Sequence, residues 1–178
     1  MDPREREEYR ALRATIRERG TARVWIFVAG IAAWAALTMA VASLTSPPVA
    51  TLMPLLVLAA AFEGVFALHV GVERVGRYIH VFFEEEGRGW EHTAMAFGRP
   101  RGSAATDAIF TVPFLLAALF NLAPALIAQP TRPELIFVGG AHALFVLRLV
   151  VARAGASKQR TVDLARFQEL RKRETGRG

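Results

Sequence analysis

The sequence predicts an all-α membrane protein, namely a polytopic four-transmembrane-helix bundle. Amphipathic cytoplasmic helices are expected at the N-terminus, at the C-terminus and as an extension of the second span. Three observations support this fold class. Hydrophobic residues make up 53% of the 178 residues and are gathered in long uncharged runs. These runs are apolar on all sides of a helix, unlike the helices of a soluble bundle. The basic residues lie almost entirely on one side of the predicted membrane.

The first two spans come from one run of 39 uncharged residues, from Val24 to Phe62. As a single helix this run would be about 58 Å long, about twice the thickness of the hydrocarbon layer. The chain therefore has to turn back. Pro47 and Pro48, in the segment LTSPPVAT, provide the break because proline cannot continue a helix. We expect the spans at about 23–44 and 49–72.

Two further apolar runs predict the third and fourth spans. Residues Ala108 to Thr131 contain no charged residue, and Leu135 to Ala152 contain only Arg148. Each run has the length that a helix needs to cross the hydrocarbon layer. The predicted spans are 108–129 and 134–153, which completes a transmembrane domain at 23–153 with a cytoplasmic loop at 87–107.

The arginine and lysine residues predict the orientation. Residues 1–23 hold seven of them, 73–107 hold five and 148–178 hold nine, whereas the two other connectors hold only Arg132. By the positive-inside rule, both termini and the central loop are cytoplasmic. This topology, with anionic lipids at the cytoplasmic face, accounts for the net charge of +6, so no nucleic-acid partner is expected. We expect the protein in the cytoplasmic (inner) membrane of a bacterium.

The second span is predicted to continue beyond the membrane edge as an amphipathic helix. Apolar residues recur at three- and four-residue steps to about Glu86, with Gly87 as the expected end. An apolar stripe outside lipid marks a contact surface. The glutamates that follow it are either a docking patch for a basic partner or a solvated helix end. The candidates for partner contact are Val75, Ile79, Phe82, Phe83, Glu84, Glu85 and Glu86.

Each terminus is predicted to form an amphipathic helix, in residues 1–22 and 154–178. At the N-terminus, Asp2 is the expected cap, Pro3 lies in the first turn and Glu5 occupies the capping-box position. The apolar stripes of both helices are narrow. They predict either a cytoplasmic cluster with the extension of the second span, which we favour, or helices that lie on the inner leaflet.

Four polar residues lie within the predicted spans, where ionisable groups are costly and point to a function. Estimated from the outer surface, Glu63 and Arg148 are about 20 and 22 Å deep, and Asn121 and His142 about 15 and 13 Å. Equal depth predicts a Glu63–Arg148 ion pair inside the bundle, shielded from lipid. The cluster is either a relay or substrate site, or a pair that fixes helix register. Arg148 could alternatively extend towards the inner headgroups.

No cofactor or metal site is expected. Cysteine is absent, which excludes disulfides and thiolate metal sites. His69 and His142 differ in estimated depth by about 15 Å, which disfavours axial ligation of a shared haem. A metal site from His80, Glu84, Glu91 and His92 is geometrically conceivable, but no metal-binding motif supports it.

The sequence also contains no G-x-S-x-G, P-loop or G-x-G-x-x-G motif, so we do not expect an enzyme. The predicted function is that of a small accessory or scaffold subunit in a larger membrane complex, with other membrane-protein subunits or a second copy as partner. The alternative is a small homo-oligomeric transporter or proton-coupled channel that uses the intramembrane polar cluster.

Overall fold

The computed structural model of the chain describes residues 1–44, 47–84, 88–97 and 104–176. All regular structure within these residues is helical, which confirms the predicted all-α class. The elements in chain order are α1 (Pro3–Ser43), the 3-10 turn η1 (Pro48–Thr51), α2 (Leu52–Phe83), α3 (Trp90–Phe97), α4 (Ala104–Ile127) and α5 (Arg132–Thr175).

The capping box predicted at the start of α1 is confirmed. The backbone N–H of Glu5 donates to the Asp2 carboxylate at 2.8 Å, and the N–H of Asp2 donates to the Glu5 carboxylate at 2.7 Å. From there α1 continues for 41 residues without a break. The predicted N-terminal helix 1–22 and the first span 23–44 are therefore parts of one helix.

The connection after α2 differs from the prediction. α2 ends at Phe83 rather than near Glu86, and the predicted loop 87–107 contains α3. The Glu84 carboxylate accepts backbone N–H groups at the start of α3 and so joins the two helices. Glu85, Glu86 and Gly87 lie outside the described residues.

The last two helices are longer than predicted. α4 begins at Ala104, before the expected start at residue 108. α5 is a single helix of 44 residues, so the predicted span 134–153 and the helix expected in 154–178 are continuous.

Three of the described helical segments are long and apolar enough to cross a membrane. They are α1, the η1–α2 segment from Pro48 to Phe83, and α5. Within the described part of α4, the apolar stretch Thr111–Ile127 is shorter. These lengths and compositions support a membrane location.

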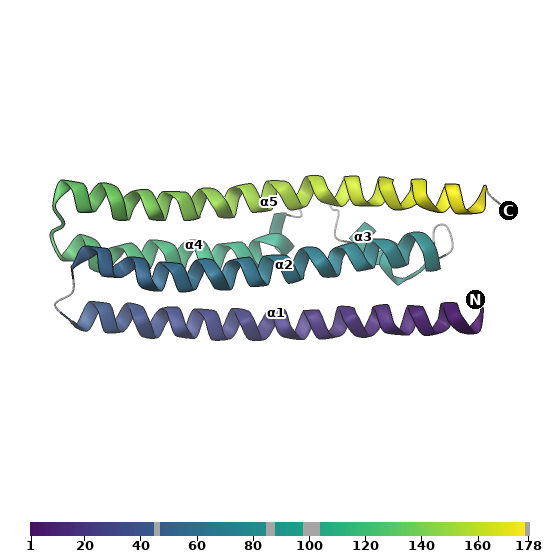
Figure 1. Cartoon of the computed structure of the whole chain (residues 1–178), viewed down its shortest axis with the longest axis horizontal. Coiled ribbons are helices and arrows are strands. Elements are labelled where there is room, and N and C mark those ends of the chain that lie inside the picture. Colours follow the sequence, from purple (N-terminus) through teal and green to yellow (C-terminus); the bar gives the residue numbers. More distant parts are fainter. Residues whose placement is uncertain (45–46, 85–87, 98–103, 177–178) are drawn as a thin grey trace. The chain divides into compact units, whose positions relative to one another are not determined.

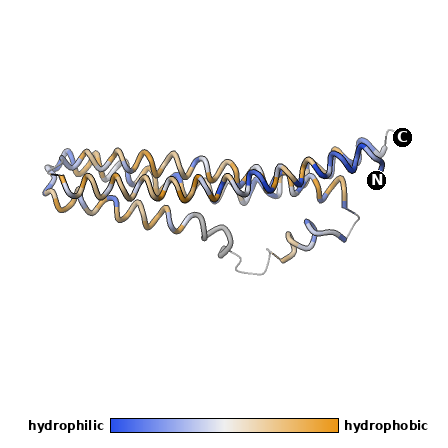
Figure 2. Tube along the Cα trace, turned by 90° about the horizontal axis from the view of Figure 1, so that it is seen from below, coloured by the Kyte–Doolittle hydropathy of each residue, from blue (hydrophilic) through white to orange (hydrophobic). Residues whose placement is uncertain are grey.

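The chain divides into two compact units. The apolar unit consists of Val24–Phe66 and Asp107–Arg153, and the charged unit of Met1–Arg23, Ala67–Thr106 and Ala154–Gly178. In the apolar unit, segments of α1, α2, α4 and α5 lie alongside one another (Figure 1). Hydrophobic residues dominate these segments, whereas hydrophilic residues are frequent in the first part of α1 and the last part of α5 (Figure 2).

The core of the apolar unit is built from α2, α4 and α5. The ring of Phe62 makes edge-on contacts with Phe114 and Phe145 at centroid distances of 5.4 and 6.1 Å. α1 has no fully buried residue, but it approaches α2 closely. A Cβ atom placed on Gly30 would lie 2.3 Å from the Cβ of Ala61, so this approach requires glycine.

Candidate functional site

The four polar residues predicted within the spans occupy two separate places in the apolar unit. Asn121 and His142 are 0% and 5% exposed and bind each other inside the unit. Glu63 and Arg148 pair with each other at its surface. No hydrogen bond or ion pair among the described residues joins the two pairs, and the expectation of a single polar cluster is replaced by two sites of different character.

Asn121 binds groups from three other elements of the apolar unit, namely α1, η1 and α5. Its side-chain oxygen accepts hydrogen bonds from Trp34 and Thr38 of α1, at 3.2 and 3.1 Å. Its Nδ2 group donates to the backbone oxygen of Thr51 in η1 at 2.9 Å. The same amide nitrogen lies 3.0 Å from Nε2 of His142 in α5. We call this set of contacts the Asn121 network.

The partners fix the protonation and orientation of the Asn121 network. The indole N–H of Trp34 can only donate and the Thr51 carbonyl can only accept, so the amide has one possible orientation. Nδ2 must then donate to Nε2 of His142. Nδ1 of His142 lies 2.8 Å from the backbone oxygen of Val138, so Nδ1 carries the hydrogen. The network therefore selects the neutral tautomer of His142 and uses both hydrogens of the amide.

Glu63 and Arg148 form the ion pair that their equal depth predicts, but the pair is not shielded. Nε and Nη2 of Arg148 each lie 2.7 Å from a carboxylate oxygen of Glu63. The guanidinium also lies over the ring of Phe66, 5.5 Å from its centroid. The Arg148 side chain is 42% exposed and that of Glu63 49% exposed. The expected burial is wrong for the single chain, because Glu63 lies on the outward side of α2 with Leu56 and Ala60.

The charged unit is held together by ion pairs that the sequence did not predict. The buried Asp163 of α5 accepts hydrogen bonds from Arg74 and Arg77 of α2, at 3.1 and 3.2 Å. Arg160 of α5 pairs with Glu73 of α2, with nitrogen–oxygen distances of 2.9 and 3.0 Å. These contacts join residues more than 80 positions apart, and no local spacing rule could have identified them.

Burial and hydrogen bonding act in opposite directions on Asp163. Burial raises the pKa of its carboxyl group, but hydrogen bonds from Gln159, Arg74 and Arg77 lower it, and the net pKa lies below the ordinary value. The carboxylate is therefore held in its charged form by its partners.

The apolar stripe on the last part of α2 is covered within the chain. Ile79 is fully buried. The ring of Phe83 contacts Tyr9 of α1 at a centroid distance of 5.8 Å, and that of Phe82 contacts Phe167 of α5 at 6.4 Å. The packing of these three helical segments matches the predicted cluster. Within the single chain, the terminal helices cover the aromatic residues of the stripe and Val75 is half-buried, and the binding of another protein there stays a prediction.

Glu84 has an intramolecular role as well. Its carboxylate accepts the backbone N–H groups of Glu91 and His92 in the first turn of α3, at 2.7 and 2.9 Å. Gly89 has φ of 127° and a Cβ there would overlap the Glu84 carboxyl group, so only glycine allows this contact. Burial raises the pKa of Glu84, but the hydrogen bonds from these N–H groups and from His80 lower it by a larger amount. The net pKa therefore lies below the ordinary value.

The histidines do not form a metal centre in the described part of the chain. The rings of His80 and His92 stack at a centroid distance of 5.6 Å, and His80 binds Glu84 at 3.1 Å. Glu91 instead pairs with Arg13 of α1 at 2.6 Å. Among the described residues, no three histidine or acidic side chains are grouped in a way that could hold a metal ion. His69 lies with its Nδ1 2.9 Å from Arg23.

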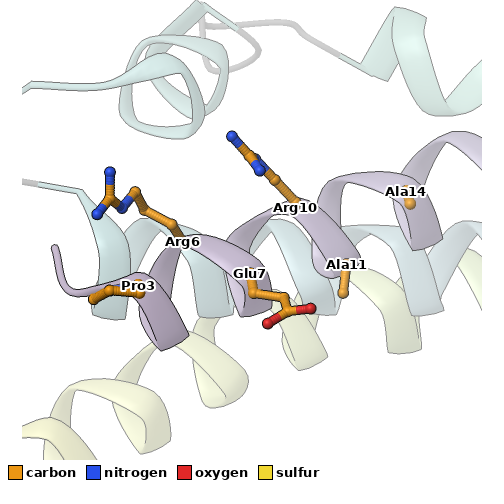
Figure 3. Close-up of a pocket in the computed structure, with 6 residues that line it drawn as sticks. All are labelled: Pro3, Arg6, Glu7, Arg10, Ala11 and Ala14. Carbon is orange, nitrogen blue, oxygen red and sulfur yellow. The ribbon is translucent and has the colours of Figure 1, made fainter.

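Two hollows were considered as binding sites. One, of about 690 Å³, is lined only by the first turns of α1. Figure 3 shows that its charged residues do not converge, since Arg6 and Arg10 point to one side and Glu7 to another. The second, of about 470 Å³, lies between the end of α1, η1 and α4 and is mainly apolar. Neither brings together groups for catalysis.

Comparison of the chain with protein-family models, curated proteins and solved structures finds no match. The features of the molecule that bear on its function are therefore the Asn121 network and the Glu63–Arg148 ion pair.

Proposed function

We propose that the protein is a non-catalytic accessory or scaffold subunit of a larger complex in a bacterial inner membrane. It crosses the bilayer four times, with both termini and the connection between the second and third spans in the cytoplasm. The one-sided distribution of arginine supports this orientation. As a helix of 24 residues, α4 would be about 36 Å long, which supports its assignment as the third of the four spans.

The observation that carries the proposal is the exposed Glu63–Arg148 ion pair. In a single chain its side chains are 49% and 42% exposed on a unit whose surface is otherwise largely apolar. Hydrocarbon cannot hydrogen-bond the outward sides of these groups, so charged residues in spans are found against protein or water. We infer that a neighbouring membrane-protein chain covers the pair.

The Asn121 network supports a structural rather than a transport role for the buried polar residues. Asn121 has partners on α1, η1 and α5 for both its oxygen and its nitrogen. A proton relay needs a group that can exchange partners during each cycle, whereas this amide uses its capacity to join helices.

The test is the purification of a tagged chain from its native membrane in a mild detergent. We expect a complex of fixed stoichiometry that contains a further membrane-protein chain. Replacing the ion pair by Glu63→Gln with Arg148→Gln should release the chain that covers the pair and lower the yield of the complex. The matched control is Leu119→Gln, which places a new amide on an exposed position of α4 and should leave the complex intact.

A second measurement separates the transporter alternative. The purified chain is reconstituted in liposomes, and proton and ion flux are recorded for the wild type and for Glu63→Gln. The accessory role predicts no flux above that of empty vesicles. Flux that requires Glu63 would reject the accessory role and favour the channel.

A further inference from the structure

The surface around the ion pair has a defined composition. On α2 it includes Leu56, Ala60 and Glu63, which follow at three- and four-residue steps and are exposed. On α5 it includes Arg148, with the exposed Leu144 and Val151 one turn before and after it. We call these six residues the α2/α5 face. It combines apolar side chains, one small residue and one pair of opposite charges.

The ion pair retains capacity to bind a second molecule. Within the chain, Nε and Nη2 of Arg148 contact the two oxygens of Glu63. A guanidinium has five donor hydrogens and a carboxylate about four acceptor positions. Two bonds therefore leave donors and acceptors on the exposed side, and an occupant of this face should offer both signs of charge.

We infer that the occupant is a second copy of this chain, related by a two-fold axis along the membrane normal; this inference rests on the proposed membrane topology. Such an axis reverses every direction in the membrane plane. Because Glu63 and Arg148 lie side by side on two neighbouring helices, rotation puts each carboxylate opposite the other chain's guanidinium. The α2/α5 face is thus complementary to itself in charge, and Ala60 permits close approach of α2 to α5 of the second copy.

The inference is tested with two charge variants of the purified full-length chain in nanodiscs or detergent. Glu63→Arg carries two positive groups on the face and Arg148→Glu carries two negative groups. Wild type should form dimers. Each variant alone should associate about ten-fold or more weakly, because like charges meet across the axis. Mixed in equal amounts, the two variants should form a heterodimer.

A cysteine-crosslinking experiment checks the position of the interface. The chain contains no cysteine, so single substitutions can be made directly in the wild-type background. Ala60→Cys mixed with Leu144→Cys should give a covalent dimer on oxidation, because the axis places α2 of one copy against α5 of the other. The matched control replaces Ala60→Cys by Leu119→Cys, on an exposed position of α4, and should give no covalent dimer.

Folding is controlled with the chain that combines Glu63→Arg and Arg148→Glu. This swap restores the pair within the chain and the complementarity across the axis, so its dimer should match that of wild type. A wild-type chain that stays monomeric, or a dimer that neither charge variant weakens, would overturn the inference.

The outcomes also separate this inference from the proposed function. A homodimer that never joins a larger complex leaves the inference standing and rejects the accessory role. A complex in which one copy of this chain binds a different protein through Glu63 and Arg148 rejects the inference and retains the accessory role.

Discussion

Replacing Asn121 by leucine should destabilise the apolar unit without changing the volume of its core greatly. The substitution removes the hydrogen bonds to Trp34, Thr38, Thr51 and His142. Interhelical hydrogen bonds in membrane proteins contribute about 0.6 kcal/mol each on average. The loss of four such bonds lowers the free energy of unfolding by about 2.4 kcal/mol.

The assay is reversible unfolding in mixed micelles, in which the fraction of a denaturing detergent is raised and helix content is followed by circular dichroism. Leu119→Ala is the matched control, because Leu119 is exposed on the same helix and has no part in the network. It should change the free energy of unfolding by less than about 0.5 kcal/mol.

A double-mutant cycle with His142→Leu tests whether the contacts act together. The single variant removes one of the bonds to Asn121, so the double variant should be less destabilised than the sum of the two single effects. An Asn121→Leu chain as stable as wild type would refute the view that this amide holds the helices in register. Strict additivity would show that Asn121 and His142 act separately.

Three further predictions concern packing and ionisation. Gly30→Ala should lower the free energy of unfolding by about 1–3 kcal/mol because its Cβ would overlap that of Ala61, and adding Ala61→Gly should recover most of the loss. Asp163→Asn should lower the free energy of unfolding by about 1–3 kcal/mol at neutral pH. Because the folded-state pKa of Asp163 is lowered, the difference in the free energy of unfolding between variant and wild type is complete above the ordinary pKa of 3.8 and should shrink as the pH falls below that value. A difference that stays constant with pH would contradict the role of the Asp163 carboxylate. Burial and the hydrogen bond to Glu8 raise the pKa of Tyr78 to about 12, so the absorbance titration should lose a step near pH 12 in Tyr78→Phe.

The long helices, unlike α3, were predictable because their signals are local. An uncharged run from Val24 to Phe62 that is too long for one span, interrupted by Pro47 and Pro48, requires a reversal at that point. The Asp2 and Glu5 capping box likewise depends on four consecutive residues. Each signal could be evaluated without knowledge of the rest of the fold.

The division of the polar residues into two sites was not predictable from depth. Counting along a helix gives the level of Glu63 or Asn121 but not the direction in which the side chain points around the axis. In a helix with one polar side, amphipathicity would supply that direction. In α2 both the outward Leu56 and the buried Leu58 are apolar, so the sequence contains no such signal.

The role of Glu84 was hidden for a different reason. As the first of three glutamates at the end of a helix, it is predicted from the sequence to belong to a docking patch or to a solvated helix end. Its partners lie seven and eight positions later, in a helix that was not predicted. The pairing of Arg77 with Asp163, across 86 positions, depends even more on tertiary structure.

The central position of Asn121 also affects how the protein is made. During synthesis, Trp34, Thr38 and Thr51 leave the ribosome well before Asn121. Until α4 joins the apolar unit, their polar groups lack the amide that joins them, and α1 and η1 are left with unmet hydrogen-bonding capacity. His142, in α5, is made last and completes the set. The Asn121 network is thus complete only when α5 packs into the apolar unit, and we expect a chain truncated before α5 to be a substrate for membrane quality control.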